Sequence, residues 1–230
     1  MIQELAWDTE FFGRKIGIIP VVVSAEEADV LIAEARKQEF RYLISRLTPT
    51  EIASVQILEQ KGFYTTDIGI VWHRSLQDIE SPRVLAREGT KEDNATVQQI
   101  SAGIFREGRF YKDPFFTREE ADRLYRTWAE NLLKGDADKV FLIGNEGFVA
   151  CKVNGNTGSI TLIGVSAEYQ NRGVGKDLVR NALAWFREKG ADIATVRTQA
   201  GNRNAIAFYE SVGFRVRNLD ITLGRIIEKR

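Results

Sequence analysis

The sequence contains very little cysteine or histidine. Cys151 is the only cysteine among the 230 residues, and His73 is the only histidine. A single cysteine cannot form an internal disulfide, and without clusters of Cys and His the usual ligands of a structural zinc site are missing. We therefore expect a protein of a reducing compartment, the cytoplasm, that holds no metal ion. Cys151 lies in a strand-like pattern, so we expect it to pack in the core.

The chain also lacks an excess of either charge and a long apolar run. Its 32 Lys and Arg residues balance its 32 Asp and Glu residues, so no overall field attracts nucleic acid or a membrane surface. The most apolar early run, residues 16–25, contains Gly17 and Pro20 and is too short to span a bilayer. Residues 1–8 have neither the positive charge nor the apolar core of a signal peptide. We expect a soluble protein, and any site for an anion must be local.

Hydrophobic periodicity divides the chain into two units, residues 1–80 and 84–230. The polar stretch 74–83, which contains Pro82, is the best candidate for a linker between them. The first unit should contain a helix that begins at the capping box 24–27, a second helix at 50–60, and strands at 42–47 and 68–73. The second unit should contain strands at 84–87, 140–144, 148–153, 159–165, 192–198 and 219–226, and helices that begin near 90, 119, 174 and 204.

The two units share a weak internal repeat. An offset of 151 residues superposes five identical pairs: Arg46 and Arg197, Glu59 and Glu210, Gly62 and Gly213, Phe63 and Phe214, Ile70 and Ile221. The predicted order in both places is strand, helix, Gly-Phe, strand. The first copy has no glycine turn like that at 173–175, so we interpret it as a structural half-domain without a second active site.

The most informative stretch is residues 170–175, Gln-Asn-Arg-Gly-Val-Gly, which follows a predicted strand and begins a predicted helix. Two glycines two positions apart allow the backbone to turn tightly or to approach a ligand. The first N–H groups of a helix have no partners within the helix, and the helix dipole makes this end positive. The pattern therefore predicts an anion site, most plausibly for a pyrophosphate. Taken alone, the glycine turn also matches many unrelated loops.

A second motif makes the pattern specific, because the chain has an Asn seven positions before a Tyr and a Gly-Phe pair four positions after it. With the glycine turn, this arrangement resembles the GNAT superfamily of acyl-CoA-dependent N-acetyltransferases. The matching residues are Gln170, Gly173, Gly175, Asn202, Tyr209, Gly213 and Phe214. The resemblance covers roughly residues 84–230. It implies an α/β fold with a mixed, largely antiparallel sheet flanked by helices, preceded here by a degenerate GNAT-like half-domain.

Within the superfamily the chain is similar to the bacterial acetyltransferases of dTDP-fucosamine, although many positions between the shared residues differ. The similarity is carried by Trp7, Asp8, Phe11, Phe12, Gly13, Arg109, Phe110, Tyr125, Trp128, Glu130, Asn131 and Gly135. Those enzymes acylate the 4-amino group of a dTDP-linked 4-amino-4,6-dideoxyhexose and carry a reduced GNAT-like half before the catalytic half. The resemblance implies acetyl transfer from acetyl-CoA to a nucleotide-linked amino sugar.

The superfamily also implies roles for residues of the second unit. The expected cofactor-binding residues for acetyl-CoA are Leu162, Ile163, Gly164, Val165, Gln170, Asn171, Arg172, Gly173, Val174, Gly175, Lys176, Asn202 and Ala205. The backbone N–H groups of the turn would hold the pyrophosphate, and strand 162–165 would pair with the pantetheine arm. Tyr209 would protonate the departing thiolate, since a phenol with a pKa near ~10 is protonated at pH 7. No spacing identifies a general base.

The aromatic and basic loop 105–116 is the candidate acceptor site. Its expected substrate-binding residues are Arg106, Arg109, Phe110, Tyr111 and Asp113, because Arg pairs with a diphosphate and aromatic rings stack on a base or sugar. Alternatively, the loop only covers the core, and we expect Trp128 to belong to the core. Two other functions stay open: acetylation of a protein N-terminus, amino acid or polyamine, or non-catalytic CoA binding. An edge strand of such a sheet is also compatible with a homodimer.

Overall fold

The computed structural model describes residues 1–102 and 108–228 and contains the predicted elements in the predicted order. The first half contains β1 (Gln3–Glu4), α1 (Ala6–Phe12), β2 (Ile16–Ile19), α2 (Ala25–Lys37), β3 (Tyr42–Leu47), α3 (Ile52–Gln60) and β4 (Tyr64–Ser75). The second half contains β5 (Arg87–Glu88), α4 (Asn94–Ser101), α5 (Arg109–Lys112), α6 (Arg118–Asn131), β6 (Lys139–Ile143), β7 (Gly147–Asn154), β8 (Thr157–Val165), α7 (Val174–Glu188), β9 (Ile193–Gln199), α8 (Arg203–Ser211) and β10 (Arg215–Ile226). The elements β1, α1, β2 and α5 were not predicted from the sequence.

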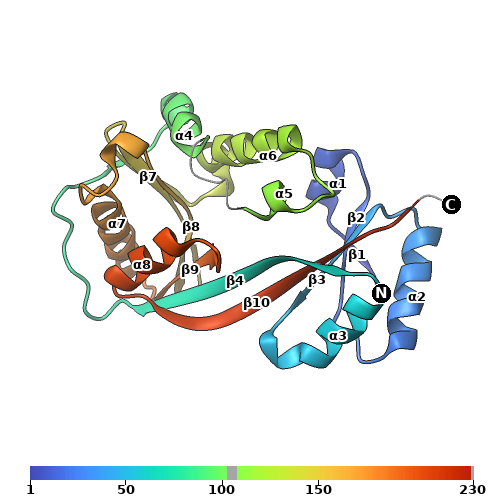
Figure 1. The fold of residues 1–230 in the computed structure, drawn as a ribbon. Coiled ribbons are helices and arrows are strands. Elements are labelled where there is room, and N and C mark those ends of the chain that lie inside the picture. The colour runs from blue at the N-terminus through green and yellow to red at the C-terminus, as the bar shows by residue number, and fades with distance from the viewer. Residues whose placement is uncertain (103–107, 229–230) are drawn as a thin grey trace.

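These strands form one continuous ten-stranded sheet in the order β1-β2-β3-β10-β4-β9-β8-β7-β6-β5. The pairs β2–β3 and β8–β9 are parallel, and the other pairs with a recorded register are antiparallel. The predicted mixed, largely antiparallel sheet with flanking helices is therefore confirmed. The long strands β4 and β10 run side by side and join the two ends of the molecule (Figure 1).

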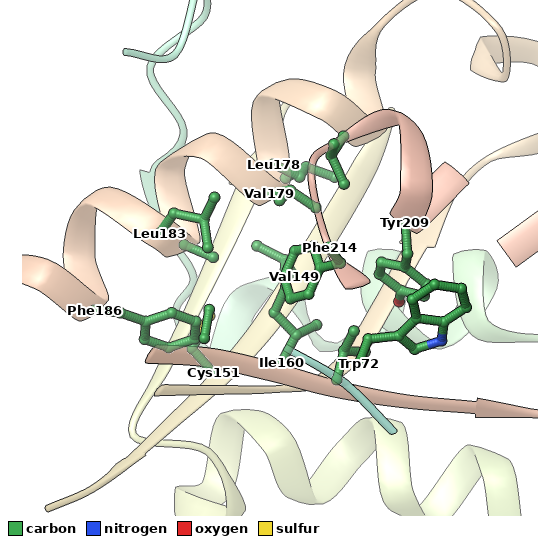
Figure 2. Close-up of a cluster of buried hydrophobic side chains, with 14 of the residues drawn as sticks. Trp72, Val149, Cys151, Ile160, Leu178, Val179, Leu183, Phe186, Tyr209 and Phe214 are labelled. Atoms are coloured by element: carbon green, nitrogen blue, oxygen red, sulfur yellow. The ribbon is translucent and has the colours of Figure 1, made fainter. Parts of the chain in front are cut away.

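Helices cover both faces of the sheet, as the alternation of side chains in β7 illustrates. Val149 and Cys151 belong to the core beneath α7, which also contains Ile160 and Phe186 (Figure 2). The intervening residues Phe148 and Ala150 face the opposite side and pack in a second core with α4 and α6. Cys151 is fully buried as expected, and burial raises the pKa of its thiol. In the first half, α2 and α3 cover one face, while α1, α5 and α6 cover the other.

The two halves exchange their last strands. β10 of the second half lies between β3 and β4, and β4 of the first half lies between β10 and β9. The pair Leu47–Ile221 in β3 and β10 becomes the pair Thr198–Ile70 in β9 and β4 when each residue is moved by the 151-residue offset. The pair Gly69–Asp220 maps onto itself, so a pseudo-twofold axis passes there. The register thus confirms the internal repeat.

Other elements differ from the expectations. The predicted linker is held against α7, because Arg83 N and Ala86 N donate to the side-chain oxygens of Asp177 and Asn181, each at 3.1 Å. The first strand of the second half is Arg87–Glu88, later than the predicted 84–87. Helix α6 ends at Asn131, and a π-helical turn continues to Asp136 before the chain reverses. Part of the predicted loop 105–116 is helical as α5.

Candidate active site

The site begins where two parallel strands diverge. β8 and β9 pair only from Thr157–Ile193 to Ile160–Val196, although both strands continue beyond these pairs. A β-bulge lies at the same point, since Ala150 pairs with Leu162 while Cys151 pairs with Ile160, and Thr161 is the extra residue. Among the described residues, the edge of β8 from Thr161 to Val165 therefore has no strand partner on the β9 side, and it borders a cleft of about 1180 Å³.

The predicted glycine turn closes one end of this cleft. Asn171 and Gly173 have φ values of +62° and +90°, the left-handed region that Gly adopts without strain. Gly173 is the N-cap of α7, so the turn delivers the chain directly into the helix N-terminus. A Cβ at Gly175 would lie 3.2 Å from the Phe208 ring, so this glycine lets α7 pack closely on α8. The side chain of Gln170 donates to Val165 O at 3.2 Å and ties the turn to the end of β8.

Tyr209 and Asn202, the two residues of the second motif, both line the cleft from α8 and its start. The Tyr209 side chain is only 4% exposed, and its ring centroid lies 6.2 Å from that of Trp72 (Figure 2). Burial raises the pKa of Tyr209 above its usual value, so the phenol is protonated at neutral pH. Asn202 Oδ1 accepts from Ala205 N at 3.0 Å, so this side chain also caps α8.

The other end of the cleft is a chamber between the sheet and the helices α1, α5 and α6, which we call the acceptor chamber. Its sheet side consists of Arg46 from β3, Asp67 from β4, Arg197 from β9 and Thr222 from β10. Its helix side consists of Trp7, Asp8, Gly108, Arg109, Phe110, Tyr125 and Trp128. Trp7 is 40% exposed, and its ring lies 6.4 Å from that of Trp128. The chamber thus combines two tryptophans with three arginines and two carboxylates.

The structure brings most of the expected cofactor-binding residues to one cleft. Eleven of the thirteen border the cleft directly, and Tyr209 joins them there; ten of these are Leu162, Ile163, Gly164, Val165, Gln170, Asn171, Gly173, Gly175, Lys176 and Asn202. Ala205 also borders it. Two do not: Val174 packs in the core, and the Arg172 guanidinium lies 5.5 Å from the Tyr169 ring.

The expected acceptor residues are more dispersed. Arg109 and Phe110 border the chamber, whereas Arg106 lies outside the described residues. Tyr111 does not border it, and its ring stacks on Tyr125 at 5.5 Å. Asp113 is 2% exposed and also lies outside the chamber lining, since its carboxylate accepts from two tyrosine hydroxyls of β3 and β4. The buried carboxylate therefore anchors the segment that carries Arg109.

Several chamber residues were missed as site candidates. Trp128 borders the chamber, whereas we had expected it only in the core. Asp8, Arg46, Asp67 and Arg197 come from four separate elements, and no local spacing relates them. Two signals in the sequence could have found part of this set: Trp7 and Asp8 belong to the family resemblance, and Arg46 and Arg197 are equivalent in the repeat.

Two kinds of feature are absent from the described residues 1–102 and 108–228. Within these ranges no three His, Cys, Asp or Glu side chains are grouped so that they could hold a metal ion. None of the helices there combines the length and the apolar character that a membrane span requires.

Residues 106–214 match the model of the acetyltransferase (GNAT) family. The chain is 17% identical to the spore coat polysaccharide biosynthesis protein SpsD of Bacillus subtilis, over 93% of this chain and 78% of that protein. Its fold is similar to a GCN5-related N-acetyltransferase from Sphaerobacter thermophilus, with a TM-score of 0.63, 14% identity and coverage of 93% and 73%. It is also similar to a tandem GNAT protein from the clavulanic acid biosynthesis pathway, with a TM-score of 0.58, 14% identity and coverage of 86% and 68%.

Proposed function

We propose that this chain, an acyl-CoA-dependent N-acetyltransferase with the GNAT fold, acetylates the amine of a nucleotide-linked sugar, a dTDP-linked 4-amino-4,6-dideoxyhexose. One observation carries the proposal. A single cleft joins the glycine turn and Tyr209 at one end to a chamber with exposed tryptophan and arginine side chains at the other. Aromatic faces suit a base or sugar ring, and guanidinium groups suit phosphate oxygens. The similarity to SpsD, which is named for polysaccharide biosynthesis, points the same way.

The residues at the turn end fit acetyl-CoA as the acyl donor. The left-handed Asn171 and Gly173 and the start of α7 direct backbone N–H groups to one place, which suits a pyrophosphate. The unpaired edge of β8 offers backbone groups to an extended chain such as pantetheine. Acetyl-CoA supplies the activated acetyl group when bound. In our proposal Gln170, Gly175, Lys176, Asn202 and Ala205 shape this end of the cleft.

Tyr209 is the proposed proton donor. The amine nitrogen forms a bond with the thioester carbonyl carbon, the carbon–sulfur bond breaks, and the thiolate takes the proton of the Tyr209 hydroxyl. Burial keeps this phenol protonated at neutral pH, which a donor requires. The proton that the amine loses passes to solvent, so no general base is assigned among the chamber carboxylates.

Thiol release from acetyl-CoA with a panel of amines tests the acceptor. We expect dTDP-4-amino-4,6-dideoxy sugars to give kcat/KM values at least about 100-fold above those of amino acids, polyamines and peptides with a free N-terminus. A peptide or polyamine as the best acceptor would contradict the sugar assignment. CoA binding without turnover of any amine would instead indicate a non-catalytic module.

A further inference from the structure

The repeat places two arginines at equivalent positions that have different surroundings. Arg46 in β3 and Arg197 in β9 are related by the 151-residue offset, and both border the acceptor chamber. The pseudo-twofold axis at Gly69–Asp220 relates the strands around them. If the two halves were identical in sequence, Arg46 would therefore make the same contacts as Arg197.

Arg197 is fully paired with carboxylates. Its Nε and Nη2 atoms donate to Asp220 at 2.9 and 2.6 Å, and Nη2 also donates to Asp67 at 2.9 Å. The guanidinium lies across Gly69, where a Cβ would collide with it. These contacts raise the pKa of Arg197. This arginine is therefore a structural link between β9, β4 and β10, with few donors left for a ligand.

Arg46 lacks both carboxylates. The offset replaces Asp67 by Asn218 and Asp220 by Gly69, so each acid of the Arg197 cluster has a neutral residue as its equivalent. Among residues 1–102 and 108–228, no carboxylate forms an ion pair with Arg46. Its side chain is exposed at the chamber surface. Arg197 in the second half is thus neutralised by carboxylates, whereas Arg46 in the first half borders the chamber without an ion-pair partner among the described residues.

Arg109 supplies a second cation with unused donors. Its Nη1 atom is buried and has no hydrogen-bond partner in the described part of the chain. Arg109 and Arg46 border the same chamber, and burial first, then the positive charge of Arg46, lower the pKa of Arg109. Asp8 borders the same chamber, and burial raises the pKa of its carboxyl group, while the positive charges of Arg109 and Arg46 act against this rise. Three arginines and two carboxylates line the chamber, and the buried Asp113 also attracts Arg109. The Nη1 donor of Arg109 is nevertheless unpaired, and a buried unpaired donor is costly unless a ligand satisfies it.

We infer that Arg46 and Arg109 together form an anion subsite, built across the two halves, that holds the diphosphate of the acceptor. The first half contributes Arg46 from β3, and the second contributes Arg109 from α5. Guanidinium groups match phosphate oxygens with paired hydrogen bonds, which Lys cannot reproduce. The subsite assigns to the degenerate half a direct part in acceptor binding. The inference rests on the proposed function, because it takes the acceptor to be a nucleoside diphosphate sugar.

Calorimetric titration of dTDP and of inorganic pyrophosphate tests the subsite, with saturating CoA present to fill the glycine turn. We expect the unmodified enzyme to bind both, Arg46→Gln to weaken dTDP binding about tenfold or more, and Arg46→Lys to recover only part of it. Arg217→Gln is the matched control, since it removes the same charge from an exposed position of β10 outside the cleft. It should leave binding unchanged, and Arg46 is exposed, so its variants should fold.

The outcomes separate this inference from the proposed function. Equal dTDP binding by the unmodified enzyme and Arg46→Gln, or no diphosphate binding beside bound CoA, overturns the subsite even if amino sugar nucleotides are acetylated. Loss of dTDP binding in Arg46→Gln supports the subsite even if the amine panel reveals another acceptor. In turnover assays the subsite predicts a raised KM for the acceptor with an unchanged KM for acetyl-CoA.

Discussion

Replacing Tyr209 by Phe removes the proposed proton donor and almost nothing else. The ring packs between aromatic neighbours, with centroids 6.2 Å from Trp72 and 5.7 Å from Phe214, and Phe keeps both contacts. We therefore expect the free energy of unfolding to change by less than about 1 kcal/mol. A positioned general acid contributes about 10²- to 10⁴-fold in rate. Turnover should fall at least about 100-fold, which is about 2.7 kcal/mol of transition-state stabilisation.

The assay is thiol release at saturating acetyl-CoA and acceptor, with CoA affinity and thermal unfolding measured on the same samples. Tyr169→Phe is the matched control, because Tyr169 also borders the cleft and has no proposed chemical role. Burial raises the pKa of Tyr209, so turnover of the unmodified enzyme should show no loss from its ionisation below about pH 10. If Tyr209→Phe turns over within threefold of the unmodified enzyme while binding CoA equally well, the proton-donor role is wrong.

Three further changes test other parts of the structure. Gly173→Ala forces a φ of +90° on a residue with a Cβ. We expect it to lower the free energy of unfolding by about 1–2 kcal/mol and to raise the KM for acetyl-CoA about tenfold. The control is Gly155→Ala in a hairpin turn with a φ of +57°, which should also lower the free energy of unfolding but leave this KM unchanged. Asp113→Asn weakens the buried carboxylate that accepts hydrogen bonds from two tyrosine hydroxyls. Calorimetry should therefore show a lower Tm, and kinetics should show a raised KM for the acceptor substrate. An unchanged Tm would contradict the role of Asp113 as an anchor of the segment that carries Arg109. The Arg87 guanidinium lowers the pKa of Asp93, so this pair stabilises the fold above the unfolded pKa of about 3.9 and ceases to do so as the pH falls. Urea unfolding should show a lower free energy of unfolding for Arg87→Gln than for the unmodified protein at pH 7. This difference between the two proteins should narrow below about pH 4, and a difference that stays constant with pH would refute the linkage.

Local signals in the sequence predicted the turn end of the cleft well. The glycine turn, the helix that follows it and the capped helix before Tyr209 are all defined by residues within a few positions of one another. Positive φ at Gly173 and side-chain capping by Asn202 are local requirements, so a single segment can reveal them. The parts of this end that concern ligand contact stay predictions, because their geometry depends on acetyl-CoA itself.

The acceptor chamber could not be predicted in the same way, because it depends on contacts between distant segments. Asp113 shows the difficulty: we expect it from the sequence to bind substrate, but its carboxylate accepts from the hydroxyl groups of Tyr42 and Tyr64, 71 and 49 residues away. Similarly, Arg46 and Asp67 reach the chamber only because β10 enters the sheet between β3 and β4. No periodicity in either half indicates that exchange.

The exchange of β4 and β10 also bears on the proposed division into residues 1–80 and 84–230. This division separates the two halves that the internal repeat relates, but each half completes its sheet with a strand of the other. Without β4, β9 would lose its antiparallel partner, and without β10, β3 would lose its own. Unpaired backbone groups at such edges are unfavourable in a buried sheet, so we propose that the halves fold as one unit. This interdependence gives a physical reason why a half without a glycine turn is retained: it completes the catalytic sheet and brings Asp8, Arg46 and Asp67 to the acceptor chamber.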